Sequence, residues 1–157
     1  MRNARTEASP AGIRRLALTL GVISALGLVV GLAVSRAQRL PEGPEPIAWD
    51  REACAACRMH VGDPRFAAQL QTTDGQILNY DDPGCLLSDL AARRPQVHAL
   101  WLHDSTSDRW LTDAQSAFVA APATPMNYGL AVVPRATAGA IDWAQATARV
   151  LDRSRRP

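Results

Sequence analysis

Four donors suited to a soft metal ion fall close together in the segment Cys54-Ala-Ala-Cys57-Arg-Met59-His60. Thiolate and thioether sulfur bind soft ions such as Cu(I) in preference to hard ions. A loop that turns between Cys54 and Cys57 can bring both thiolates to one ion, and Met59 adds a neutral sulfur. Because a neutral ligand carries no charge penalty and needs no proton for release, it suits a carrier. The motif therefore favours a soft metal ion, Cu(I) above all.

The same two cysteines are compatible with two other kinds of site. In an exported protein, Cys-x-x-Cys can be a redox disulfide, but thioredoxin-like proteins place it at a strand–helix junction. Here it follows a Pro-rich segment. Structural zinc needs four ligands, and no second pair of donors is spaced to complete them. A thiol–disulfide oxidoreductase that uses Cys54 and Cys57 stays as the alternative function.

Three residues outside the motif are further candidates. A loop methionine taken alone is more often structural, but Met126 lies in polar surroundings without the period of a core residue, so we count it as a ligand. His103 ends a strand beside Asp104, which could orient its imidazole; an ordinary strand-end role fits equally well. Cys85 is expected to be a buried free thiol on a helix, with a third sulfur ligand as the alternative.

Composition argues for a small binding protein. The chain has 157 residues and a formal net charge of +2, so it offers one domain after a targeting segment and no strong field for nucleic acid. No Ser-His-Asp arrangement, phosphate-binding loop or dinucleotide fingerprint appears in it. We therefore predict that the protein is not an enzyme.

The N-terminal segment has the pattern of a membrane anchor. Residues 16–35 are uncharged and mostly apolar, and a helix of that length spans roughly 30 Å, the thickness of a bilayer core. Arginines are in excess before this run, so we expect residues 1–15 in the cytoplasm and the domain in the periplasm. The protein would be a single-pass protein of the inner membrane. Residues 36–48 are read as a Pro-rich linker.

We predict one folded domain at 49–151, followed by a basic tail at 152–157. Its helices and strands must position the sulfur donors. Asp82 and Pro83 mark the start of a helix at 83–92, as N-cap and first helical residue. The turn Thr73-Asp74-Gly75 predicts a hairpin. Strands are expected at 65–72, 76–80, 97–103, 109–112, 117–120 and 129–133, and a closing helix at 137–153.

Several motifs occur in a fixed order from about residue 49 to residue 133. They are Cys54-x-x-Cys57-x-Met59, Asp63-Pro64-Arg65-Phe66-Ala67-Ala68-Gln69, Tyr80-Asp81-Asp82-Pro83-Gly84-Cys85-Leu86-Leu87, Trp101-Leu102-His103-Asp104, Trp110, Asp113-Ala114 and Thr124-Pro125-Met126. In this order and spacing they resemble the NosL family, the accessory proteins of nitrous oxide reductase that handle copper.

The resemblance implies a fold, a function and partners. The fold would be a small α+β domain of two ββαβ-like parts, similar to organomercurial lyase. The function would be Cu(I) delivery to nitrous oxide reductase with an ABC-type membrane complex, as a chaperone in denitrification. The family's Cys/Met ligands would map onto Cys54, Cys57, Met59 and Met126. Unlike the usual lipoprotein members, this chain has no cysteine at the end of its apolar run, so the helix would replace the lipid as anchor.

Overall fold

The computed structural model describes residues 10–37 and 40–154, in two compact units that divide between residues 39 and 40. The first unit contains the helix α1 (Pro10–Ala37), whose described side chains are exposed. Among those residues, no helix is both long and apolar enough to cross a membrane. The span predicted at 16–35 includes side chains at 16, 17, 19 and 33–35 that lie outside the described ones, as do residues 1–9 of the predicted cytoplasmic segment.

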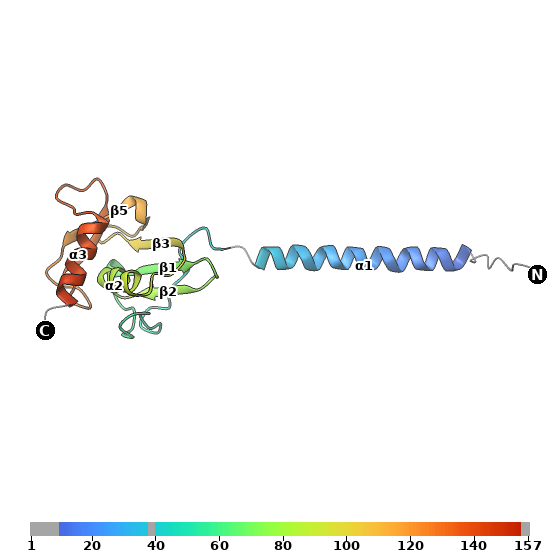
Figure 1. The fold of residues 1–157 in the computed structure, drawn as a ribbon, viewed down its shortest axis with the longest axis horizontal. Coiled ribbons are helices and arrows are strands. Elements are labelled where there is room, and N and C mark those ends of the chain that lie inside the picture. Colours follow the sequence, from blue (N-terminus) through green and yellow to red (C-terminus); the bar gives the residue numbers. More distant parts are fainter. Residues whose placement is uncertain (1–9, 38–39, 155–157) are drawn as a thin grey trace, which may run out of the picture. The chain divides into compact units, whose positions relative to one another are not determined.

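A four-stranded antiparallel sheet forms the centre of the second unit (Figure 1). Its strands, in spatial order, are β2 (Ile77–Tyr80), β1 (Ala68–Thr72), β3 (Val97–His103) and β4 (Trp110–Thr112). A short 3-10 helix, η1 (Pro64–Phe66), precedes β1. β1 and β2 form the predicted hairpin, and Gly75 has a φ of 87° in its turn, where glycine carries no steric penalty. All of β1 is buried.

Helix α2 (Pro83–Arg93) confirms the predicted helix start. The Asp82 side chain accepts a hydrogen bond from the Gly84 N–H, and Pro83 occupies the first helical position, where its missing N–H costs nothing. α2 lies against β1 and β2 and also contacts α3 and β6 (Figure 1). Leu86 and Leu87 are buried in the same core cluster as Tyr80 and Phe118. Burial of such side chains contributes about 1.5–3 kcal/mol each relative to exposure.

The second half of the domain differs from the expected second ββαβ part. β4 joins the first sheet, and after η2 (Asp113–Gln115) a separate ribbon forms from β5 (Ser116–Ala120) and β6 (Leu130–Pro134). α3 (Trp143–Ser154) begins later than predicted, because Ile141 pairs with Phe118 as a β-bridge. Within the described residues no strand follows α3. The domain is thus α+β, as predicted, with one ββαβ part.

The segment predicted as a Pro-rich linker lies partly on the sheet. The compact unit begins at residue 40, and the amide of Gln69 donates to the Glu45 carbonyl at 3.0 Å and that of Gln71 to the Gly43 carbonyl at 2.7 Å. Both glutamines are buried on β1. Because a buried amide needs partners, β1 holds residues 43–45 in place. The boundary at 48 was therefore set too late.

Candidate metal site

The Cys-x-x-Cys loop is closed by its own backbone. The Cys54 N–H donates to the Met59 carbonyl at 2.7 Å, and the Arg58 N–H donates to the Cys54 carbonyl at 3.1 Å. Ala53 and His60 pair across the base of the loop as an isolated β-bridge. Arg58 has a φ of 66°, a left-handed conformation that reverses the chain between the second cysteine and the methionine. The loop therefore holds its cysteines at one end of a tight turn.

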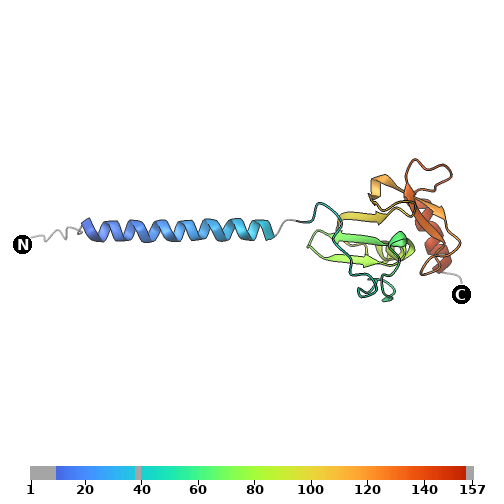
Figure 2. The ribbon, with the colours of Figure 1, turned by 180° about the vertical axis from the view of Figure 1, so that it is seen from behind.

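This loop is fastened to the sheet through β2. The Ala55 N–H donates to the Asn79 carbonyl at 2.8 Å, and the Asn79 side chain hydrogen-bonds the Glu52 carboxylate. Figure 2 shows the loop beside the β2 edge of the sheet. Cys54 is fully buried and packs in the core, whereas Cys57 is half-buried and Met59 is 59% exposed. The loop thus directs one thiol inward and leaves another near solvent.

Cys85 joins the two cysteines of the loop. It lies in the first turn of α2 and is 1% exposed, and the sulfur atoms of Cys54, Cys57 and Cys85 all lie within 4.8 Å of one another. A metal–sulfur bond of about 2.3 Å would hold three sulfurs about 4 Å apart around a trigonal ion. Small side-chain movements would therefore let all three thiols bind one ion. Three sulfur donors match a soft metal such as copper.

The three thiols differ in their acidity. A hydrogen bond from Cys85 lowers the pKa of Cys54 to about 5. Burial alone would raise this pKa, and hydrogen bonds from backbone N–H groups lower it further. Burial raises the pKa of Cys57. The hydrogen bond with Cys54, together with burial, raises the pKa of Cys85. One thiolate flanked by two thiols is therefore present near neutral pH, and an incoming ion would displace the two remaining protons.

The loop that carries Met126 is fixed to the start of α2. The Asp82 carboxylate accepts the Met126 N–H at 3.0 Å with the oxygen that its helix cap leaves unused. A Cβ on Gly84 would lie 2.1 Å from Cγ of Tyr128, so the Tyr128 ring rests directly on the helix backbone. Met126 is half-buried and packs against the core cluster that includes Cys54 and Cys85. The structure thus fastens the Met126 loop to the start of α2, at Asp82 and Gly84, directly before Cys85.

His103 does not belong to the thiol group. Among the described residues, the cysteines alone form a group of metal-binding geometry. The Nε2 of His103 lies 3.2 Å from an Asp108 oxygen, and its ring meets Trp110 edge to face. Its Nδ1 is buried without a partner. His103 as a ligand stays a prediction.

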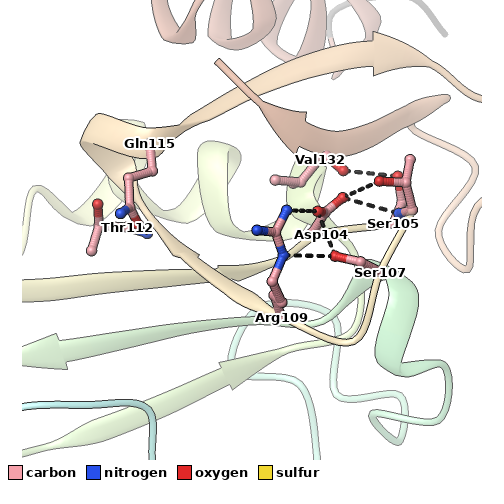
Figure 3. Close-up of polar contacts among 8 residues, drawn as sticks. Asp104, Ser105, Ser107, Arg109, Thr112, Gln115 and Val132 are labelled. Atoms are coloured by element: carbon pink, nitrogen blue, oxygen red, sulfur yellow. Dashed lines mark hydrogen bonds and ion pairs between the residues drawn. The ribbon is translucent and has the colours of Figure 1, made fainter. Parts of the chain in front are cut away.

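Asp104, which in one of the two interpretations would orient the His103 ring, has other partners. Its carboxylate accepts hydrogen bonds from Thr106, Ser107 and Arg109 within the β3–β4 turn (Figure 3). These bonds satisfy a fully buried carboxylate. The interpretation of Asp104 as a partner of His103 was wrong, because the turn itself takes up both carboxylate oxygens.

For Cys85, sequence analysis expected a buried free thiol and gave a metal ligand only as the alternative. Its position on the apolar face of a helix was read as an isolated buried thiol, and it is indeed buried. The signal that distinguishes the two interpretations is its position at the beginning of α2, directly after β2, to which the Cys-x-x-Cys loop is bonded. That signal depends on knowing which strand the loop contacts.

Comparisons with known proteins give one distant structural likeness. No protein family and no curated protein matches the sequence. Among solved structures, the chain is similar to the copper chaperone NosL from Shewanella denitrificans, at 18% sequence identity. The match covers 71% of this chain and 88% of that chain with a TM-score of 0.48. The functional proposal therefore has to rest on the chemistry of the thiol cluster.

Proposed function

We propose that this protein is a metallochaperone that binds Cu(I) and passes it to another protein. The observation that carries the proposal is the convergence of three thiol sulfurs within 4.8 Å of one another. Met59 lies in the loop of the first two thiols, and Met126 is bonded to Asp82, three residues before Cys85. Sulfur ligands select Cu(I) over hard ions. Structural zinc suits the group less well, because it needs four Cys, His or carboxylate ligands, and the group found among the described residues contains three.

Release of the ion is supported by the uneven exposure of its ligands. Cys54 and Cys85 are buried, whereas Cys57 is half-buried and Met59 is 59% exposed. A partner's sulfur or imidazole could therefore attack the ion from the side of Cys57 and Met59. Ligand exchange of this kind moves the ion without breaking a substrate bond, which is why we propose a carrier rather than an enzyme.

The proposal also names the protein that receives Cu(I) and the compartment in which the domain works. The order of motifs that resembles the NosL family favours nitrous oxide reductase, with its ABC-type maturation complex, as the recipient. The apolar run at 16–35 and the arginines before it favour export of the domain to the periplasm. Fractionation of cells that carry the full-length chain tests the second point: recovery in the cytoplasmic fraction would contradict it.

The first experiment is a Cu(I) titration of the reduced full-length protein against a chelating competitor. We expect one tight equivalent, which Cys54→Ser and Cys85→Ser should abolish. Cys57→Ser should bind more weakly but still compete. A matched control is Ala92→Ser, a small substitution at an exposed position of the same helix as Cys85. If the wild-type protein cannot compete with the chelator, the carrier function is refuted.

One observation favours the alternative, a thiol–disulfide oxidoreductase. The pKa of Cys54, lowered to about 5, is the property of a reactive thiol. However, Cys54 is fully buried, and the thiol at the helix start is Cys85 rather than a member of the Cys-x-x-Cys pair. Reduction of a disulfide substrate by the metal-free protein, lost in Cys57→Ser, would favour this alternative. Cu(I) should inhibit it.

A further inference from the structure

We propose that Asp82 is a positioning residue that holds Met126 at the thiol cluster by bonding two segments of the chain at once. This inference rests on the proposed function, because it assigns a task to Asp82 in the same Cu(I) site. Asp82 touches no metal in this scheme. It acts through the backbone of Met126.

The Asp82 side chain hydrogen-bonds two separate segments of the chain. Its side chain is fully buried, and its two oxygens have different partners: Oδ1 accepts the Gly84 N–H at 2.8 Å and Oδ2 accepts the Met126 N–H at 3.0 Å. An N-cap needs the first of these bonds alone. A buried carboxylate is costly unless its oxygens are hydrogen-bonded, so the second bond stabilises the loop in its observed place.

A second contact fixes the same loop independently. The ring of Tyr128 occupies the space where a side chain on Gly84 would stand, with Tyr128 Cβ itself only 2.4 Å from the Cβ position. Glycine at this helical position therefore permits the loop to approach. Two residues of the loop, Met126 and Tyr128, thus contact the N-cap Asp82 and the helical residue Gly84, which directly precedes Cys85. Met126 packs against the same buried cluster that contains Cys54 and Cys85.

Substitutions at Asp82 can remove one bond and keep the other. Asn and Ser are N-caps as good as Asp, so Asp82→Asn and Asp82→Ser should retain α2. An Asn side chain that keeps its oxygen on the Gly84 N–H presents its NH2 group, a donor, to the Met126 N–H, and a Ser hydroxyl is too short to bridge the two groups. Asp63→Asn is the matched control, because Asp63 also caps a helix through its side chain but receives no bond from the Met126 loop.

The decisive readout is the coupling between Asp82 and Met126 in Cu(I) affinity. In the wild-type full-length protein and in Asp63→Asn, we expect Met126→Ala to weaken Cu(I) affinity about tenfold, or about 1.4 kcal/mol, as for loss of one ligand. In Asp82→Asn and Asp82→Ser, affinity should already be reduced, and Met126→Ala should change it less than about twofold. A loss in the Asp82 variants that simply adds to that of Met126→Ala would overturn the proposal.

A spectroscopic measurement reports the same geometry directly. The chain has three methionines, at positions 1, 59 and 126, so selenomethionine in Met59→Leu protein leaves Met126 as the single labelled residue of the domain. Selenium X-ray absorption of the Cu(I) form should show a copper neighbour that disappears in Asp82→Asn. Met59→Leu/Met126→Leu gives the baseline. A copper neighbour that persists in Asp82→Asn would refute the positioning role, while absence of Cu(I) binding in the wild type would refute the proposed function instead.

Discussion

The acidity of Cys54 depends on its neighbour Cys85, and substitution of Cys85 tests this directly. The hydrogen bond from the Cys85 thiol is the largest cause that lowers the pKa of Cys54 to about 5. A hydrogen bond to a charged group contributes about 1.5–3 kcal/mol, which is about 1–2 pKa units. In Cys85→Ala, we therefore expect the pKa of Cys54 to rise to about 6–7. Cys85→Ser retains an O–H donor and should keep the pKa close to its original value.

The chain is well suited to this measurement because it has three cysteines. In a Cys57→Ser background, Cys85→Ala and Cys85→Ser each leave Cys54 as the sole thiol. Its titration can be followed by the ultraviolet absorbance of the thiolate in metal-free, reduced protein, with Cys54→Ser as blank. An unchanged midpoint in Cys85→Ala, or an equal rise in both variants, would refute the reasoning, because the donor would then have no effect.

The same shift predicts how stability depends on pH. The pKa of Cys54 is lower in the folded protein than its ordinary value of 9.0. Its thiolate therefore contributes stability that is fully present above about pH 9 and is lost as the pH falls toward 5. Urea unfolding of the metal-free protein across this range should show stability falling with pH, and Cys54→Ser should flatten the profile. A profile of equal slope in Cys54→Ser would contradict this origin.

Three further predictions concern the frame around the site. Gly84→Ala should cost about 1–3 kcal/mol, because the new methyl must displace the Tyr128 ring; an unchanged melting temperature would contradict that contact. Asp104→Asn should cost about 1–3 kcal/mol at neutral pH. Burial raises the pKa of Asp104, but hydrogen bonds outweigh it and lower that pKa to about 2. The difference in the free energy of unfolding between Asp104→Asn and the wild type, measured with urea, should therefore vanish as the pH falls from 4 toward 2. Asp89→Ala should cost about 1–3 kcal/mol of stability, because it leaves the buried Tyr80 hydroxyl without its acceptor. Chemical denaturation should show that Tyr80→Phe, added to Asp89→Ala, recovers part of this loss. No recovery would mean that the hydroxyl is not the cause.

Local signals in the sequence predicted most elements of the domain. Turn residues between two apolar segments predicted the β1–β2 hairpin, and the Asp82-Pro83 pair predicted the start of α2, since these effects act over a few residues. The start of α3 was wrong because Ile141 forms a bridge to Phe118, a contact between distant segments that outweighs helix periodicity. The linker boundary was wrong for the same reason, since β1 glutamines bind residues 43 and 45.

The sequence by itself determined the chemistry of the site: soft sulfur donors gathered in Cys54-Ala-Ala-Cys57-Arg-Met59, whose spacing alone lets one loop present two thiols. Only the tertiary structure decided that Cys85 lies with them and that the Nε2 of His103 lies within hydrogen-bond distance of Asp108. The physical reason is that these contacts depend on bonds between segments far apart in the chain. β2 brings the loop to the start of α2, and Asp82 bonds Met126 across 44 residues. No local propensity encodes such pairs, because they form only when the sheet and helix bury their common core.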